Sequence, residues 1–166
     1  MKIFQTGLFY WWVIPVTVLL DQLTKWLIVE NIPYQGNVNI FSWFSLVYVH
    51  NTGAAFSFLS GAGGWQNYLF MLIALLAVIF ITIGLSRISR SQVFLALSLV
   101  FIAGGAIGNV IDRLCYGYVI DFILVYVQGV FTYPAFNVAD SFITLGVIMM
   151  IIQTLFFERK KEEGHD

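Results

Sequence analysis

The segment at residues 93–113 decides the fold, and it reads VFLALSLVFIAGGAIGNVIDR. No charged side chain occurs in it before its last two residues. A bilayer core about 30 Å thick requires about 20 predominantly apolar residues in a helix. Three further segments meet this requirement, so the predicted spans are roughly 8–29, 67–86, 93–111 and 138–157. Lipid cannot satisfy the polar groups of an open strand edge, so all four spans are predicted to be helices.

Composition supports a membrane protein. Of the 166 residues, 60% are hydrophobic and only 10% are charged, and the mean hydropathy is +0.86. Soluble domains carry about 25% charged residues, so the chain is predicted to be one integral membrane domain over residues 1–166. A net charge of −1 argues against nucleic acid as a partner, because phosphate binding needs clustered basic side chains. A single cysteine excludes an internal disulfide.

Basic residues predict the orientation of the spans. Most Lys and Arg residues occur at the amino terminus, between the second and third spans, and in the tail: Lys2, Arg87, Arg90, Arg159, Lys160 and Lys161. These three regions lie on one side of a four-span topology. The positive-inside rule therefore places both termini in the cytoplasm and the loops 30–66 and 112–137 outside.

The first outer loop has the composition of strands. Residues 38–50 read VNIFSWFSLVYVH, which is rich in β-branched and aromatic types. Such a run favours two or three short strands. The predicted fold is therefore an all-α membrane protein with four transmembrane helices and a small extracytoplasmic β-sheet in the first outer loop.

Two aspartates lie beside the predicted hydrocarbon region. Asp121 is in the sequence VIDF, at the end of the second outer loop, and Asp140 stands where the last span begins. An ionisable residue in such a place indicates a functional site. If the two carboxyls converge, they form the acid and base of an aspartic peptidase. For Asp140 a structural role remains open, because Asn137 and Asp140 have the spacing of a helix capping box.

Three other constellations each allow a structural and a functional interpretation. Asp21 and Lys25 share a helix face, so they form either an ion pair or a site in which Lys25 activates a serine, with Ser57 and Ser141 as candidates. Residues 104–113 combine a small-residue face, Gly104 and Gly108, with a polar helix end of Asn109, Asp112 and Arg113. That end either anchors the loop or grips a peptide backbone. Asn51 either makes a turn or binds substrate.

Five segments together resemble the signature blocks of bacterial lipoprotein signal peptidase, also called signal peptidase II. In order along the chain, they are DQLTK (21–25), HNTGAAF (50–56), GGAIGNVIDR (104–113), VIDF (119–122) and FNVADS (136–141). The order, the spacing and the four-span frame all match, and the resemblance covers nearly the whole chain.

The resemblance implies an activity and a site. Members of this family are aspartic endopeptidases of the bacterial plasma membrane, with the active site at the extracytoplasmic face. They act on diacylglyceryl-modified prolipoproteins, cut on the amino side of the lipidated lipobox cysteine, and release the signal peptide. The family's catalytic pair maps onto Asp121 and Asp140. Its substrate-binding residues map onto Asn51, Asn109, Arg113 and Asn137, and no metal or organic cofactor is implied. Membrane lipid is expected to contribute to recognition, because the lipid chains of the substrate stay in the bilayer.

Three other functions compete with this interpretation. A small transporter or channel would use Asp21, Lys25 and Asp112 as an ion path, but it would need polar residues through the bilayer depth. The middles of the second and fourth spans are nearly all apolar. A non-catalytic scaffold would not require Asp121 in its position. A serine-lysine signal peptidase is the remaining enzymatic alternative.

Overall fold

Four long apolar helices and a small sheet make up the computed structural model, which describes residues 3–53 and 63–158. The helices are α1 (Val13–Asn31), α2 (Trp65–Arg87), α3 (Val93–Tyr116) and α4 (Val138–Ile152). Short 3-10 turns, η1 (Ile3–Gln5) and η2 (Gly7–Trp12), precede α1, and a π-helical turn, η4 (Gln153–Glu158), extends α4. Within the described residues, four helical segments are long and apolar enough to cross a membrane. Each predicted span thus coincides with a helix that is long and apolar enough to cross a membrane.

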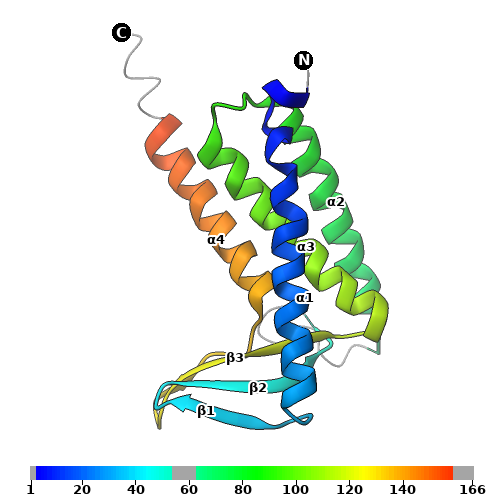
Figure 1. Ribbon diagram of the computed structural model, residues 1–166, viewed down its shortest axis with the longest axis vertical. Coiled ribbons are helices and arrows are strands. Elements are labelled where there is room, and N and C mark those ends of the chain that lie inside the picture. Colours follow the sequence, from blue (N-terminus) through cyan, green and yellow to red (C-terminus); the bar gives the residue numbers. More distant parts are fainter. Residues whose placement is uncertain (1–2, 54–62, 159–166) are drawn as a thin grey trace.

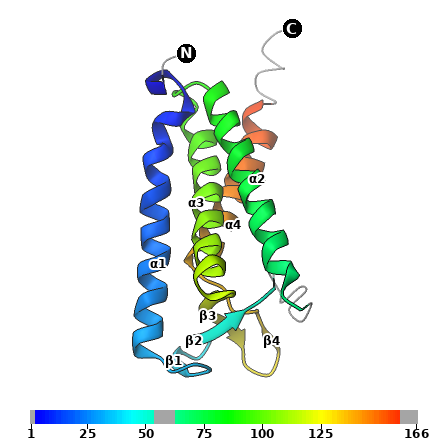
Figure 2. The ribbon, with the colours of Figure 1, turned by 90° about the vertical axis from the view of Figure 1, so that its right-hand side faces the viewer.

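The helices form an elongated bundle around α3 (Figures 1 and 2). Helix α3 packs against α1, α2 and α4. Both termini lie at one end of the bundle, and the sheet lies across the other end, below α1 and α4 in Figure 1. An even number of crossings produces this arrangement, and it agrees with a topology in which both ends of the chain are on the same side.

The sheet draws on two loops at this end of the bundle: the loop 30–66 contains the predicted strands, and the loop 112–137, for which no strand was predicted, adds two more. Strands β1 (Asn37–Phe41) and β2 (Phe44–Asn51) come from the first loop, and β3 (Val119–Val127) and β4 (Phe131–Thr132) from the second. All neighbours are antiparallel in the order β1-β2-β3-β4. The pairing of β2 with β3 sets Val49 opposite Asp121. Non-local pairing of this kind brings the two outer loops to one place.

The end of α3 and the start of α4 are each fixed by a specific capping residue. Helix α3 runs to Tyr116, past the predicted end at 111, and stops where Gly117 adopts a positive φ of 80°. A left-handed residue at this position is easiest for glycine, which lacks a Cβ. Helix α4 begins at Asn137, whose side chain accepts a hydrogen bond from the Asp140 amide while the Asp140 side chain accepts one from the Asn137 amide. The predicted capping box is therefore present.

Glycines let α3 approach its neighbours closely. A Cβ at Gly104 would collide with Thr17 of α1, and one at Gly108 would lie 2.6 Å from the Asp21 carboxylate. The predicted small-residue face is thus confirmed, with α1 as its partner. A Cβ at Gly105 would meet the carbonyl oxygen of Ala139, so α4 packs on an adjacent face. Close approach on both faces brings the polar groups of α1, α3 and α4 within hydrogen-bonding reach.

Candidate active site

Asp121 and Asp140 line one cavity at the sheet end of the bundle. Asp121 lies on β3 and is only 1% exposed, and Asp140 is in the first turn of α4. The cavity has a volume of about 900 Å³. Its wall beyond the aspartates is largely apolar and includes Phe70, Ile73, Ala77, Ile102, Ala106 and Ile148 from α2, α3 and α4. A pair of acids therefore stands at one end of a groove that continues between helices.

The Asp121 carboxylate is held by two asparagine amides. The Asn51 Nδ2 group donates to one oxygen at 2.9 Å, and the Asn137 Nδ2 group donates to the other at 2.7 Å. Burial, and to a lesser extent the nearby charge of Asp140, raise the pKa of Asp121 to about 7 against the opposing effect of the two amides. A carboxyl with such a pKa exchanges its proton near neutral pH, as an acid or base catalyst must.

Asp140 is held by two donors in a similar manner. The Asn109 Nδ2 group donates to one oxygen at 2.8 Å, and the backbone N–H of Asn137 donates to the other at 3.2 Å. The second contact belongs to the capping box. The structural and functional interpretations of Asp140 are thus compatible, because a side chain fixed by its own helix start also faces the cavity.

Asn137 connects the two aspartates. Its side-chain nitrogen bonds to Asp121, and its backbone nitrogen and side-chain oxygen bond to Asp140. The side-chain nitrogen of Asn137 also donates to the side-chain oxygen of Asn109 at 3.1 Å and to the carbonyl oxygen of Ile120 at 3.3 Å. Asn137 is completely buried and is not part of the cavity wall. Its geometry supports a role in holding the pair rather than the contact with substrate that the sequence predicts.

Three other predicted residues do line the cavity: Asn51, Asn109 and Arg113. The Asn51 side-chain oxygen accepts the Gly53 amide at 2.9 Å, so the predicted turn is present together with the contact to Asp121. Arg113 donates to the backbone oxygens of Gly53 and Asn109 at 2.9 and 3.3 Å. Its buried Nε has no hydrogen-bond partner among the described residues. The remainder of the motif that follows Asn51, from residue 54, lies outside the described residues.

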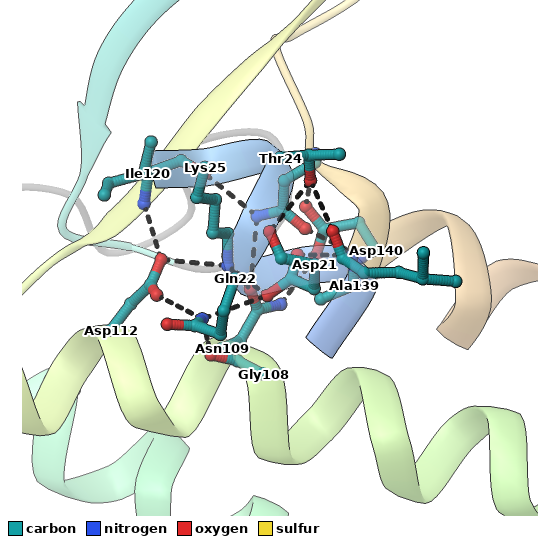
Figure 3. Close-up of polar contacts among 12 residues, drawn as sticks. Asp21, Gln22, Thr24, Lys25, Gly108, Asn109, Asp112, Ile120, Ala139 and Asp140 are labelled. Atoms are coloured by element: carbon teal, nitrogen blue, oxygen red, sulfur yellow. Dashed lines mark hydrogen bonds and ion pairs between the residues drawn. The ribbon is translucent and has the colours of Figure 1, made fainter. Parts of the chain in front are cut away.

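A buried ion cluster lies beside the aspartates (Figure 3). The Lys25 ammonium is 2.8 Å from Asp21 and 2.9 Å from Asp112, and it also donates to the Asn109 oxygen at 3.2 Å. The predicted pair of Asp21 and Lys25 is thereby confirmed, and Asp112 joins it. We call Asp21, Lys25 and Asp112 the ion cluster below. Sequence spacing gave no sign of the Asp112 contact, since that residue lies 87 positions beyond Lys25 on another helix.

The contacts of Lys25 oppose the serine-lysine alternative. An ammonium offers three donors, and each donor of Lys25 has an acceptor in the ion cluster or on Asn109. The Ser141 hydroxyl donates instead to the Asn137 carbonyl oxygen at 2.9 Å. Ser57 lies outside the described residues. The arrangement therefore suits a structural cation and not a general base.

The described residues contain no arrangement typical of a metal site. Over the described parts of the chain, no group of three or more His, Cys, Asp or Glu side chains is arranged to hold a metal ion. The chemistry available at the cavity is that of two carboxyls with amide donors and one guanidinium around them. Such a pair can activate a water molecule and protonate a carbonyl oxygen in the same step.

Comparison with known sequences gives a consistent result. A family model described as signal peptidase (SPase) II matches residues 13–156. A lipoprotein signal peptidase of Acinetobacter baumannii is 44% identical over 151 residues, which is 91% of this chain and 85% of the relative. One of Alteromonas mediterranea is 42% identical over 164 residues, 98% of this chain and 90% of the relative. One of Pseudoalteromonas atlantica is 48% identical over 149 residues, 89% of this chain and 90% of the relative.

Comparison with solved structures supports the same architecture. One crystal structure of a bacterial membrane enzyme superposes with a TM-score of 0.82 at 28% identity, covering 98% of this chain and 94% of that one. A second has a TM-score of 0.78 at the same identity, covering 94% of this chain and 99% of that one. The chain therefore shares its fold with known bacterial membrane enzymes over nearly the whole of each chain.

Proposed function

The chain belongs to the signal peptidase II family and is a multi-pass membrane peptidase, and from this premise we propose that Asp121 and Asp140 are its catalytic pair. Membership of this family supports removal of signal peptides from prolipoproteins. The observation that carries the proposal is that both carboxyls line one cavity and are bonded to a single residue, Asn137. Two acids held in this way can share one proton.

In the proposed mechanism, Asp121 starts as the acid and Asp140 as the base. The raised pKa of Asp121 favours its protonated form near neutral pH. Asp140 removes a proton from a water molecule, the oxygen attacks the scissile carbonyl carbon, and Asp121 protonates the carbonyl oxygen. The resulting diol collapses as the C–N bond breaks. Asp140 then delivers its proton to the leaving nitrogen, and Asp121 recovers a proton from the diol.

The cavity suggests how substrate is held. We expect the signal-peptide backbone to run past Asn51, Asn109 and Arg113, which line the wall near the aspartates. The buried Nε–H of Arg113 has no partner within the described chain and is a donor for a substrate carbonyl. The apolar wall from α2, α3 and α4 suits lipid chains and an apolar peptide. We therefore propose that the substrate is a diacylglyceryl-modified prolipoprotein, cut on the amino side of its lipidated cysteine.

The arrangement of the bundle also supports a location for the active site. The first and the last described residues, 3 and 158, lie at the end of the bundle opposite the sheet (Figure 1). Most Lys and Arg residues occur in the sequence before α1, between α2 and α3, and after α4, and the positive-inside rule assigns these regions to the cytoplasm. We propose that the chain resides in the bacterial plasma membrane with its active site at the extracytoplasmic face.

Replacement of either aspartate by asparagine tests the proposal. Detergent-purified Asp121→Asn and Asp140→Asn should each lose cleavage of a lipidated prolipoprotein, because an amide can neither give nor take the proton. Release of the signal peptide is measured by mass spectrometry, with an unlipidated substrate as a specificity control. Thermal unfolding verifies that each variant is folded. Turnover by either folded variant would refute the catalytic pair.

A further inference from the structure

We propose that the ion cluster of Asp21, Lys25 and Asp112 is a positioning device that fixes the two catalytic aspartates relative to each other through their backbone neighbours. The inference rests on the catalytic pair proposed above. It adds three residues that act on the reaction through Asp121 and Asp140 and have no contact with substrate.

The ion cluster is separated from the catalytic cavity. Asp21 and Asp112 are completely buried, and Lys25 is 2% exposed. None of the three lines the catalytic cavity. Lys25 and Asp112 instead line a second cavity of about 320 Å³, together with residues of α1 and the strand region. Substrate in the catalytic cavity therefore does not touch the ion cluster.

Asp21 connects the ion cluster to the residue before Asp140. An oxygen of Asp21 accepts the backbone N–H of Ala139 at 2.8 Å, while the other oxygen pairs with Lys25. Ala139 immediately precedes Asp140 in the first turn of α4. The first N–H groups of a helix have no partner within it, and their dipoles favour a negative charge. Asp21 thus ties the start of α4 to α1.

Asp112 connects the ion cluster to the residue before Asp121 in the same manner. An oxygen of Asp112 accepts the backbone N–H of Ile120 at 3.0 Å and also pairs with Lys25 at 2.9 Å. Ile120 immediately precedes Asp121 on β3. Gln22 donates to the second oxygen of Asp112 at 2.8 Å and completes its contacts. Each carboxylate of the ion cluster therefore holds the residue directly before a catalytic aspartate (Figure 3).

Lys25 also fixes the amide that supports Asp140. Its ammonium donates to the side-chain oxygen of Asn109 at 3.2 Å. Asn137 donates to the same oxygen at 3.1 Å, so the nitrogen of the Asn109 amide must face Asp140, to which it donates at 2.8 Å. An asparagine amide can rotate to exchange its oxygen and nitrogen, and two donors on the oxygen prevent this.

A purely stabilising role accounts poorly for this connectivity. Buried ion pairs are weak contributors to folding stability, because the cost of desolvation offsets the attraction between the charges. The two backbone amides bonded by the ion cluster are those of Ala139 on α4 and Ile120 on β3, each directly before a proposed catalytic aspartate. Misplacement of a catalytic group by about 1 Å costs roughly 100-fold in rate. Control of position at these two amides would therefore control turnover.

The test compares two substitutions of Asp112 that both remove its charge. Asp112→Asn keeps an oxygen that can accept the Ile120 N–H, whereas Asp112→Leu has a similar volume and no acceptor. We expect kcat of Asp112→Leu to fall about 10- to 100-fold with KM unchanged. For Asp112→Asn we expect a clearly smaller loss of kcat. Leu85→Ala, in the apolar core near the other end of the bundle, is the matched control for lost stability alone.

The pH dependence of kcat is a second measurement. A substitution that only lowers stability would leave it unchanged. Two carboxyls that interact strongly titrate with well-separated macroscopic pKa values, and the separation shrinks as the groups move apart. The bell-shaped profile of Asp112→Leu should therefore be narrower than that of Asp112→Asn, and Leu85→Ala should have the wild-type profile. Equal kcat and equal profiles in the two Asp112 variants would overturn the proposal.

Two further comparisons cover the case in which Asp112→Leu does not fold and the case in which the catalytic pair itself is wrong. If Asp112→Leu does not fold in detergent, Asp21→Leu is compared with Asp21→Asn in the same way, and equal kcat and equal pH profiles in these two variants would overturn the proposal. Asp121→Asn is assayed beside them. Activity in that variant would refute the catalytic pair itself, whereas its inactivity combined with unaffected Asp112 variants would refute only the positioning role.

Discussion

Asn137 contacts both aspartates through its side chain and its backbone. It donates to Asp121 and accepts from the Asp140 backbone, while its own backbone amide donates to the Asp140 carboxylate. An asparagine side chain carries its donor and its acceptor on two separate atoms without a charge, and it is short enough to be a good N-cap. A carboxylate at this position would put a third negative charge between the pair. The sequence alone could identify the cap but not the contact with Asp121.

Activity is expected to fall as pH rises through about 7. The pKa of Asp121 is raised to about 7 by burial and by the charge of Asp140, so its proton is present below that pH and lost above it. Above about pH 7, kcat/KM should decline about tenfold per pH unit, because the acid that protonates the scissile carbonyl is missing. The measurement is kcat/KM with a lipidated prolipoprotein in buffers from about pH 5 to about pH 9.

Stability measurements provide the control for this prediction. The folded chain keeps the Asp121 proton between its ordinary pKa of 3.8 and about 7, whereas the unfolded chain does not. The folded state then binds more protons, so the free energy of unfolding should decrease as pH rises through that window. Asp121→Asn should lack this part of the dependence. A rate that stays level to about pH 9 in folded wild-type protein would contradict the assignment of Asp121 as the acid.

At the scale of elements, strand β3 was the main feature that sequence did not reveal. Residues 119–127 read VIDFILVYV, a run of nine with one polar side chain. A strand with one wet face would alternate, but the first four residues of β3 are all buried, so no period of two appears. The position of Asp121 depends on pairing with β2, about 70 residues earlier, which local patterns cannot show. The spans, in contrast, follow from composition and length alone.

The close contact of α3 and α4 predicts an effect of Gly105→Ala. The added methyl group would meet the carbonyl oxygen of Ala139 and lie 2.7 Å from Ile143, so α4 must shift away from α3. Overpacking of this kind costs roughly 1–3 kcal/mol. Because the contact is one residue from Asp140, we also expect a lower kcat. Thermal unfolding and turnover in detergent measure the two effects.

Gly84→Ala is the matched control for that substitution. Its Cβ would have its nearest neighbour, a methyl of Leu99, at 3.9 Å, which is ordinary contact. Alanine also favours a helix over glycine by about 1 kcal/mol. The control should therefore match or exceed wild-type stability and keep wild-type turnover. Equal behaviour of the two alanine variants would show that α3 and α4 tolerate separation at Gly105.

At the scale of the whole molecule, the order of the spans and the positions of Lys and Arg favour one polarity of the chain in the membrane. Most Lys and Arg residues occur in the sequence before α1, between α2 and α3, and after α4, and the sheet lies at the end of the bundle opposite the loop between α2 and α3. Sequence predicted this polarity, because it depends only on the order of spans and the sites of Lys and Arg. It could not predict that both outer loops join in one sheet, since that requires the helices to be assembled first.

Cysteine labelling tests this orientation. In a Cys115→Ser background, Ser42→Cys places a thiol in the exposed turn between β1 and β2, and Ser91→Cys places one in the exposed loop between α2 and α3. A membrane-impermeant maleimide applied to cells with a permeabilised outer envelope should label only the first. The second should react once the plasma membrane is opened. The reverse pattern would place the active site in the cytoplasm.

The bond between Asp21 and the Ala139 amide joins positions 118 residues apart and has a consequence for biosynthesis. The proposed reaction needs groups from α1, β2, α3, β3 and α4, and its second acid arrives only with the last span. While the ribosome is still adding earlier spans, the nascent chain holds one carboxyl without its counterpart and has no hydrolytic competence. We therefore expect a translation product that stops before residue 140 to be inactive. The order of synthesis thus delays proteolysis until insertion into the bilayer is nearly complete.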